Sequence, residues 1–220
     1  MPTSKAAPRD ALDHPALSES VRALARRGEV RSYRKGTLLI QEGDVGDTIY
    51  IILGGRLRVF GSNAGNEREI THGTYGPGEY VGEMSLDGGL RSASVMTLES
   101  SACAVITRTT LERHIAEHPA FAFELLSKVI RRARDATLSA KRMALNDVYG
   151  RLKQLLESTA EAQADGTCLI AERLTHLDIA HRIGCTREMV SRVMKELETG
   201  GYVQLAAAGL RVLRPLPARW

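Results

Sequence analysis

The uneven distribution of glycine is the feature of this sequence that most restricts how the chain can fold. Fourteen of the 20 glycines lie between Gly28 and Gly89, where they separate short apolar runs. Within one run, every second residue from Ile49 to Leu53 is apolar. Because side chains two positions apart share one face of a strand, this pattern predicts half-buried strands joined by tight turns. We therefore expect residues 1–118 to form a compact β unit with flanking helices.

The composition is that of an ordinary globular protein, with 43% hydrophobic and 25% charged residues. The formal net charge of +4 and the isoelectric point near 9.1 permit a polyanionic partner without requiring one. No apolar run approaches the roughly 20 residues that cross a bilayer, and residues 1–15 lack the apolar core of a signal peptide. We expect a cytoplasmic protein without a membrane segment, and a mobile arm at residues 1–15.

The three cysteines, Cys103, Cys168 and Cys185, are widely spaced and form no C-x-x-C pair. This spacing argues against a disulfide framework, a zinc site and an iron–sulfur cluster. We expect all three to be buried or half-buried and to behave as small apolar residues.

The segment 119–146 contains no glycine, and no proline after Pro119. Small or apolar residues recur in it at alternating steps of four and three: Leu126, Ile130, Ala133, Thr137, Ala140 and Ala144. Such a heptad seam predicts a long helix that packs along another helix. One alternative is that the seam packs on the chain's own β unit. We favour a parallel homodimer, because two-stranded coils suit a narrow seam and symmetric pairs are the commonest oligomers.

Residues 147–220 contain a second helical pattern, which ends in two short strands. Asp147 is placed to cap a helix, so we expect a hinge at residues 145–147. Two helices joined by a tight turn and then a hairpin follow, at residues 174–184, 187–201, 202–205 and 210–213. This order predicts a winged helix-turn-helix. Its apolar face should consist of Ile179, Ala180, Ile183, Val190, Val193, Met194 and Leu197.

The polar face of the second helix in this motif carries residues that suit contact with DNA. Arginine can bind the O6 and N7 atoms of guanine, and glutamate can accept from the cytosine amino group. We expect Arg187 and Glu188 to meet base edges, with Arg192 and Ser191 near the same face. Thr186 is placed to cap the helix, and Lys195 can reach a phosphate. The alternative is a solvated face held by i,i+4 pairs such as Glu188 with Arg192.

Taken together, these segments resemble the CRP/FNR family of bacterial transcription regulators. The likeness spans nearly the whole chain, and the stretch IGCTREMVSRVMKELE at residues 183–198 resembles the recognition motif of the cAMP-receptor branch. It implies an α+β fold: a β-roll of the double-stranded jelly-roll type, a long dimerisation helix and a winged helix-turn-helix. It also implies that Arg187, Glu188 and Arg192 read a TGTGA-like half-site of a palindrome in double-stranded DNA, with RNA polymerase as a further partner.

The stretch GEMSLDGGLRSASV at residues 82–95 places a carboxylate and a guanidinium on either side of a glycine-rich loop. A cyclic nucleotide needs a cation and backbone N–H groups for its phosphate, and an acceptor for its ribose hydroxyl. The set Gly82, Glu83, Met84, Ser85, Arg91 and Ser92 supplies them. In the resembling family this loop is the phosphate-binding cassette, which implies that Glu83 takes the ribose hydroxyl and that Arg91 and Ser92 take the phosphate. The alternative is a surface pair of Glu83 with Arg91, worth under about 1 kcal/mol.

One departure from the family pattern affects the identity of the effector. Where the cAMP-binding branch has adjacent Thr and Ser on the dimer helix, this chain has Ala136 and Thr137. Thr137 can supply a hydroxyl to the base across a dimer, but Ala136 cannot. Losing one such hydrogen bond costs on the order of 1 kcal/mol. We favour cAMP and keep cGMP and a cyclic dinucleotide as alternatives.

Other readings of the chain are weaker. Haem sensing needs a histidine ligand, and His72, His114 and His118 are isolated in the sequence. A regulatory module of an enzyme or channel predicts a catalytic or membrane segment, and neither is found. We expect no catalytic residue, no metal site and no catalytic cofactor, and therefore no enzyme. Constitutive DNA binding without an effector stays open, as does the choice between an activator and a repressor.

Overall fold

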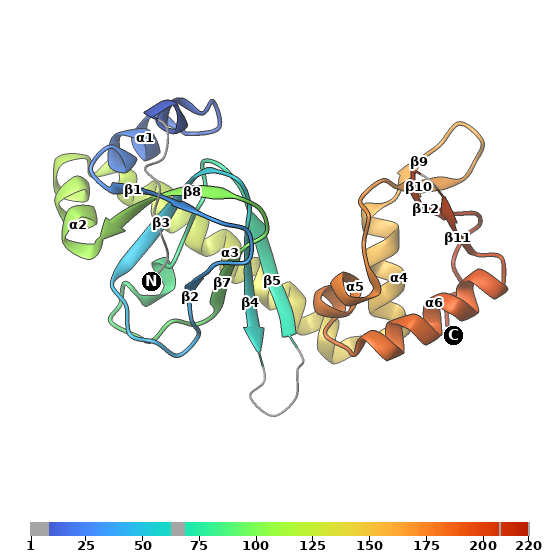
Figure 1. Ribbon diagram of the computed structural model, residues 1–220. Coiled ribbons are helices and arrows are strands. Elements are labelled where there is room, and N and C mark those ends of the chain that lie inside the picture. The colour runs from blue at the N-terminus through green and yellow to red at the C-terminus, as the bar shows by residue number, and fades with distance from the viewer. Residues whose placement is uncertain (1–8, 63–68, 207, 220) are drawn as a thin grey trace. The chain divides into compact units, whose positions relative to one another are not determined.

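The computed structural model describes residues 9–62, 69–206 and 208–219. These residues divide into two compact units, shown in Figure 1. The first holds the chain up to Ser62 together with Thr71–Ala133, and the second holds Arg134 onward together with residues 69 and 70. The sequence predicted divisions at residues 118 and 146 instead. The structure divides within the long helix, because the first turns of that helix pack on the β unit.

Eight strands and several helices make up the chain from Arg9 to Leu145. The helices are η1 (Arg9–Asp13), α1 (Glu19–Ala25), η2 (Glu83–Ser85), α2 (Arg108–Glu117) and α3 (Ala120–Leu145). The strands are β1 (Glu29–Tyr33), β2 (Leu38–Ile40), β3 (Thr48–Gly54), β4 (Leu57–Ser62), β5 (Glu69–Tyr75), β6 (Tyr80–Val81), β7 (Ser94–Thr97) and β8 (Ser101–Thr107).

The strands form two four-stranded sheets, in the orders β1-β8-β3-β6 and β2-β7-β4-β5. The pairings of β8 with β1 and β3, and of β7 with β2 and β4, are antiparallel, so neighbours in a sheet are often distant in sequence. This arrangement confirms the predicted β-roll. Sequence reasoning missed β1, whose residues show no clear alternation.

The core of the roll explains why β3 is so apolar. Ile49, Ile51 and Leu53 are buried against the helices that cover the first sheet. Ile52 faces the other way and is buried between the two sheets with Leu57. The predicted alternation is therefore present, but this strand is buried on both faces rather than half-buried.

The segment before α1 is held against the roll. Arg22 of α1 donates from Nε to the carbonyl of Leu12 at 3.0 Å and from Nη2 to that of His14 at 3.3 Å. Residues 9–13 form the short helix η1. The prediction of a mobile arm is therefore wrong for residues 9–15, and residues 1–8 lie outside the described part of the chain.

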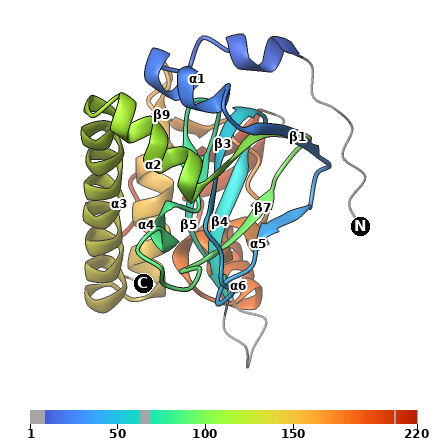
Figure 2. The ribbon, with the colours of Figure 1, turned by 90° about the vertical axis from the view of Figure 1, so that its left-hand side faces the viewer.

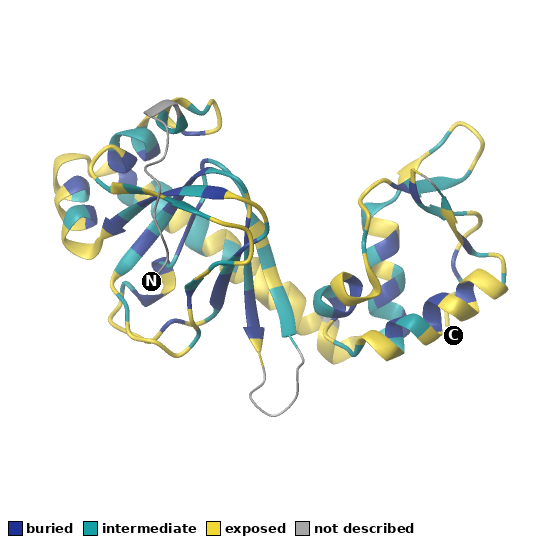
Figure 3. Cartoon of the chain, viewed as in Figure 1, coloured by how far each residue is buried: buried dark blue, intermediate teal, exposed yellow. Residues whose placement is uncertain are grey.

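Helix α3 is one uninterrupted helix, as Figure 2 shows. Its first turn packs into the roll through Phe121, which is buried. The predicted seam points elsewhere: Leu126 is 52% exposed and Ile130 is 42% exposed, and the remaining seam residues are also exposed (Figure 3). The alternative that the seam packs on the chain's own β unit is therefore wrong.

The second unit contains three further helices and a small sheet. Its elements are α4 (Val148–Thr159), β9 (Glu161–Ala162), β10 (Cys168–Ile170), α5 (His176–Ile183), α6 (Arg187–Thr199), β11 (Val203–Ala206) and β12 (Gly209–Val212). Asp147 caps α4 by accepting from the Gly150 N–H at 2.7 Å, and the helix before it ends at Leu145, as the predicted hinge requires. The sheet order is β11-β12-β10-β9, so the predicted hairpin gains two short strands that sequence reasoning missed.

The apolar face predicted for this unit forms its core. All seven of those residues are buried, none of them more than 8% exposed. The turn between α5 and α6 depends on Gly184, which adopts φ +67°, a left-handed conformation that glycine reaches without strain. These observations confirm the winged helix-turn-helix.

The described helices include none that is both long and apolar enough to cross a membrane. Cys103 is fully buried, and burial raises the pKa of its thiol to about 12; Cys168 and Cys185 are half-buried. The cysteines are therefore packing residues, as predicted.

A buried histidine makes the stability of the first unit depend on pH. His114 of α2 is fully buried, and its ring packs on those of Phe121 and His118 at centroid distances of 5.0 and 4.8 Å. Neither ring nitrogen has a hydrogen-bond partner among the described residues. Burial, and then the nearby charge of Arg27, lower the pKa of His114 in the folded protein.

We predict that stability falls as the pH drops below about 6.5, the ordinary histidine value, because the unfolded chain then binds a proton that folded His114 excludes. Above that pH His114 is neutral in both the folded and the unfolded protein, so its contribution to stability no longer changes with pH. His114→Leu should flatten the profile of urea midpoint against pH between pH 7 and 5, whereas His118→Gln, at an exposed neighbour, should keep it. An unchanged slope in His114→Leu would contradict the assignment.

Candidate functional site

The glycine-rich loop after β6 is wound tightly around two buried charged side chains. Glu83 begins the short helix η2, and Gly82 before it adopts φ +93°. Glu83 is 6% exposed and Arg91 is 7% exposed. Two oppositely charged groups this deep in the protein must each be satisfied by specific partners.

Arg91 is bound by the loop itself. Its Nη1 donates to the carbonyl of Gly82 at 2.8 Å and to Oγ of Ser85 at 2.8 Å. Its Nη2 donates to Oγ1 of Thr48 at 3.1 Å. The backbone of Arg91 also bonds to that of Gly43 and Asp44. None of its described partners is a carboxylate, so its positive charge stays available to an anion.

Two glycines allow the guanidinium to lie this close to the backbone. A Cβ at Gly46 would stand 2.5 Å from Nη2 of Arg91, and a Cβ at Gly82 would stand 2.9 Å from Nη1. Both separations are too short for real atoms, so these positions must be glycine for the cation to occupy its place.

Glu83 is paired with a residue that sequence reasoning missed. Its Oε1 accepts from Nη1 of Arg132 at 2.5 Å, and the two side chains are 2% and 18% exposed. Its other oxygen, Oε2, is buried and has no hydrogen-bond partner among the described residues. The site therefore contains a carboxylate oxygen that can accept one more hydrogen bond.

Arg132 belongs to α3, and its surroundings fix it in place. Its Nη2 donates to the carbonyl of Tyr80 at 2.5 Å, and its Cζ lies 4.4 Å above the ring of Tyr75. Burial alone would lower the pKa of Arg132, but the Glu83 carboxylate more than offsets this and raises it. Arg132 lies outside the heptad seam, and no local pattern in the sequence indicates its contact with Glu83.

The structure thus brings the predicted loop residues together, but they differ in burial and in hydrogen-bond partners. The surface-pair alternative is wrong, because Glu83 and Arg91 are buried and bond to other groups. Ser85 is buried, and its hydroxyl donates to the carbonyl of Gly46 at 2.9 Å while accepting from Arg91, so it supports the loop. Met84 and Ser92 are exposed beside it, and Thr137 is exposed on α3.

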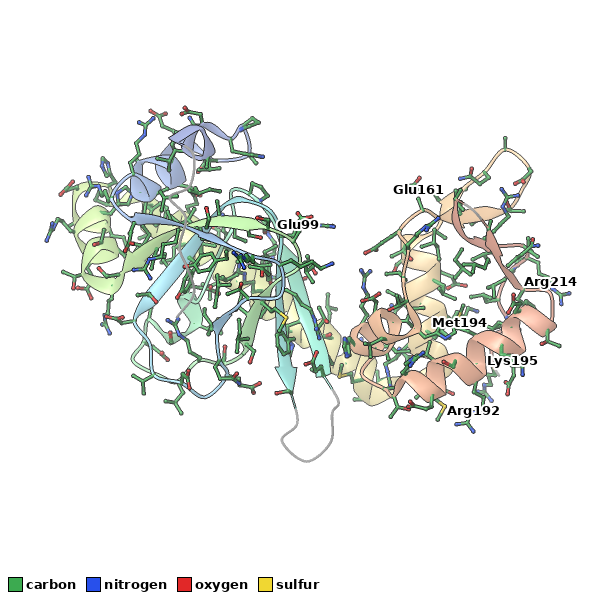
Figure 4. The ribbon with its side chains drawn as sticks, viewed as in Figure 1. Glu99, Glu161, Arg192, Met194, Lys195 and Arg214 are labelled. Atoms are coloured by element: carbon green, nitrogen blue, oxygen red, sulfur yellow. The ribbon has the colours of Figure 1, made fainter. Side chains whose placement is uncertain are left out.

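The helix-turn-helix presents its own set of polar side chains. Thr186 caps α6 by accepting from the Met189 N–H at 3.3 Å, as predicted. Arg187, Glu188, Arg192 and Lys195 are exposed. Figure 4 shows Arg192 and Lys195 on the outer side of α6, away from the buried Met194. The face opposite the core is therefore charged and accessible.

The contacts on this face differ from the alternative of a solvated face held by i,i+4 ion pairs. Among the described ion pairs, none joins Glu188 to Arg192, and Nη2 of Arg192 contacts Sδ of Met189 at 3.3 Å. Ser191 is half-buried, and its hydroxyl hydrogen-bonds Nδ1 of His176 at the start of α5, at 2.9 Å. The arginine and glutamate side chains are thus not tied to one another.

No three histidine, cysteine, aspartate or glutamate side chains of the described ranges gather as metal ligands. The two candidate sites consist of a loop around the buried Glu83 and Arg91 in the roll, and of a charged, exposed helix face in the second unit.

Comparisons with known proteins agree with this division. Residues 30–118 match the model of the cyclic nucleotide-binding domain, and residues 150–215 match that of the Crp-like helix-turn-helix domain. The chain is 31% identical over 183 residues to the cyclic AMP receptor protein of Thermus thermophilus, covering 83% of this chain and 82% of that one. It is 29% identical over 190 residues to the CRP-like cAMP-activated global transcriptional regulator of Mycobacterium tuberculosis, covering 84% of each.

A similar fold is found in the solved structure of the c-di-GMP responsive global regulator CLP of Xanthomonas campestris. The TM-score is 0.76 at 24% identity, with 90% of this chain and 99% of that chain covered. At this identity the likeness concerns the fold alone.

We predict that the buried pair of Glu83 with Arg132 is a major determinant of stability. Arg132→Met should lower the free energy of unfolding by about 3 kcal/mol, because it leaves a buried carboxylate without its cation. Adding Glu83→Gln should recover part of that loss, so a double-mutant cycle in urea should give a coupling energy of about 2 kcal/mol. Arg56→Met, at a pair that is 60% and 49% exposed, is the control and should cost under about 1 kcal/mol. Equal losses of unfolding free energy in Arg132→Met and Arg56→Met would contradict the prediction.

Proposed function

Because this chain belongs to the CRP/FNR family of transcription regulators, we propose that it is a homodimer whose binding to DNA depends on a cyclic nucleotide, with cAMP as the favoured effector. Family membership makes the chain a DNA-binding regulator with a cyclic nucleotide-binding domain. The effector, the operator sequence and the dimer are the proposed parts.

The unpartnered Oε2 of Glu83 is the observation that supports an effector most directly. A buried carboxylate oxygen without a donor is unusual in a folded protein, and the ribose 2′-hydroxyl of a cyclic nucleotide is a suitable donor. The charge of Arg91 then lies across the same loop for the cyclic phosphate, with the exposed hydroxyl of Ser92 beside it. Gly82 and Met84 complete the loop that would surround the ligand.

The names of two relatives support cAMP as the favoured effector. Two proteins that cover more than four fifths of this chain at 29% and 31% identity are named for cAMP. The regulator named for c-di-GMP resembles this chain in fold, and the CRP-like protein Clp of Xanthomonas campestris is 28% identical to it over 195 residues, so a cyclic dinucleotide stays an alternative. Thr137 would offer a hydroxyl to the base from the second subunit. cGMP and a cyclic dinucleotide are the alternatives, because Ala136 removes one polar contact.

The exposed seam of α3 supports the homodimer. Leu126 and Ile130 are 52% and 42% exposed in the single chain, and the other four seam residues are exposed as well. Apolar side chains repeated along one stripe of a helix are stabilised when a second helix covers them. A parallel pair would bring two recognition helices together under one twofold axis, as a palindromic site requires.

On α6, Arg187 and Glu188 lie in the first turn, which is the part of a recognition helix that meets base edges. We assign them, with Arg192, to a TGTGA-like half-site, and Lys195, Thr186 and Ser191 to contacts at its border. RNA polymerase is the further partner that regulation of transcription would require.

For the effector site, we predict that Ser92→Ala weakens cAMP binding about tenfold, because it removes one hydrogen bond to a charged phosphate. Arg91→Lys should weaken it further, since lysine cannot reproduce the bonds of the guanidinium. Ser100→Ala, at another exposed serine of the roll, should leave the affinity unchanged. Isothermal titration calorimetry measures all three, and absence of cyclic nucleotide binding by the unmodified protein would contradict the proposal.

For the DNA site, we predict that Arg187→Ala relaxes discrimination at one guanine of each half-site by about 1–3 kcal/mol. Lys195→Ala should instead weaken binding to all sequences alike and reduce the salt dependence. Fluorescence anisotropy with the palindromic duplex and single-base variants measures both, and titration should end at two chains per duplex. A loss of affinity in Arg187→Ala that is equal on all sequences would overturn the assignment of Arg187 to a base. An end point of one chain per duplex would overturn the homodimer.

A further inference from the structure

Two cations of α3 lie on two tyrosine rings of the roll. Lys128 Nζ stands 4.4 Å from the centroid of the Tyr80 ring and donates to the carbonyl of Gly78 at 3.1 Å. Arg132 Cζ stands 4.4 Å from the centroid of the Tyr75 ring. Residues four apart on a helix share one face, so α3 turns a continuous cationic edge toward these rings.

We propose that Tyr75 is a positioning residue of the effector site: its ring holds the Arg132 guanidinium on Glu83, and through it links occupancy of the site to helix α3. The inference rests on the proposed function, because it takes a cyclic nucleotide as the occupant. Tyr75 itself does not touch the effector in this account.

The geometry around Arg132 fixes a planar group in three ways. One edge of the guanidinium donates to Oε1 of Glu83, and Nη2 donates to the carbonyl of Tyr80. Its Cζ lies over the ring of Tyr75, an arrangement that is favourable for a cation and an aromatic ring and is stronger where water is excluded. With Oε1 engaged in this way, Oε2 is the oxygen left for the effector's hydroxyl.

The local sequence of β5 allows the ring to take this position. Tyr75 is the last residue of the strand, and its hydroxyl lies over Gly73, where a Cβ would be only 2.8 Å away. A side chain at residue 73 would therefore push the ring out of the place where it supports Arg132. On its inner side the ring packs against the core between the two sheets.

The position of Arg132 along α3 explains how its contact with Tyr75 can affect the rest of the helix. Beyond it, the described side chains at residues 133–141 and 143–145 are all exposed. Arg132 is thus the last side chain along the described part of α3 that is not exposed. A change in what Glu83 binds would act on α3 where the helix leaves its support, next to Thr137 and the proposed dimer seam.

A structural role confined to the core would give Tyr75 a different signature. If the ring only filled space, its removal would lower stability and leave the linkage between effector and DNA intact. The test therefore compares Tyr75→Leu, Tyr75→Phe, which keeps the ring, and Tyr33→Leu. Tyr33 is a half-buried tyrosine packed on the same core, and its ring lies 6.5 Å from that of Tyr50.

The measurement is the coupling factor, which is the ratio of the dissociation constants for the palindromic duplex without and with saturating cAMP. In Tyr75→Leu we expect this factor to fall by about tenfold or more, on the scale of one desolvated cation–ring contact. Tyr75→Phe should stay within about threefold of the unmodified protein, and Tyr33→Leu should do the same despite a lower unfolding midpoint. Normal coupling in Tyr75→Leu, or equal losses in Tyr75→Leu and Tyr75→Phe, would overturn the proposal.

A second measurement needs no effector. Hydrogen exchange of the backbone amides at residues 130–134 in the ligand-free protein should become faster in Tyr75→Leu than in Tyr33→Leu, because Arg132 then holds α3 to the roll less firmly. Equal exchange would overturn the proposal. Should Tyr75→Leu fail to fold, Arg132→Lys, which keeps the charge but not the planar group, should show both effects, and normal values there would count against the proposal.

These measurements distinguish a wrong effector from a wrong role for Tyr75. If the unmodified protein binds no cyclic nucleotide, the proposed effector is wrong and the assignment of Tyr75 falls with it. If the unmodified protein binds cAMP and responds to it, while Tyr75→Leu responds equally, the proposed function stands and only the role of Tyr75 is rejected.

Discussion

A carboxylate that is 2% exposed cannot remain charged without a cation close to it, and in this protein the cation beside Glu83 is Arg132 of the long helix α3. This single requirement connects parts of the molecule that are distant in sequence. The loop that carries Glu83 is held in shape by Arg91, and α3 is attached to the roll through Arg132. The site in the roll and the helix that leaves it therefore share one ionised group, which is the physical basis for expecting that one reports on the other.

The other half of the mechanism is built from caps and turns rather than buried charge. Asp147 starts α4, Thr186 starts α6, and Gly184 allows the sharp turn between α5 and α6. Because these local devices fix the recognition helix on its own core, its exposed arginines need not serve the fold. The exposed side chains of α6 are then available for the proposed contacts with DNA.

The sequence was informative where one local rule decides the outcome. Glycine placement predicted a compact β unit, the seam predicted a long helix whose stripe does not pack on that unit, and the apolar face around Val190 was predicted residue by residue. Strands β9 and β10 were missed because such short strands exist only through tertiary pairing. Arg132 was missed for a similar reason: nothing local shows that a charged helix residue will meet a carboxylate 49 positions earlier in the chain. The roles of the individual site residues remain predictions.

The account depends on a free-energy linkage between the two sites, and linkage must be reciprocal. The most direct test is to measure the dissociation constant of cAMP by calorimetry, first with the free protein and then with the protein saturated by its palindromic duplex. The account predicts that DNA tightens cAMP binding by the same factor as cAMP tightens DNA binding. Identical cAMP affinities in the two titrations would contradict it.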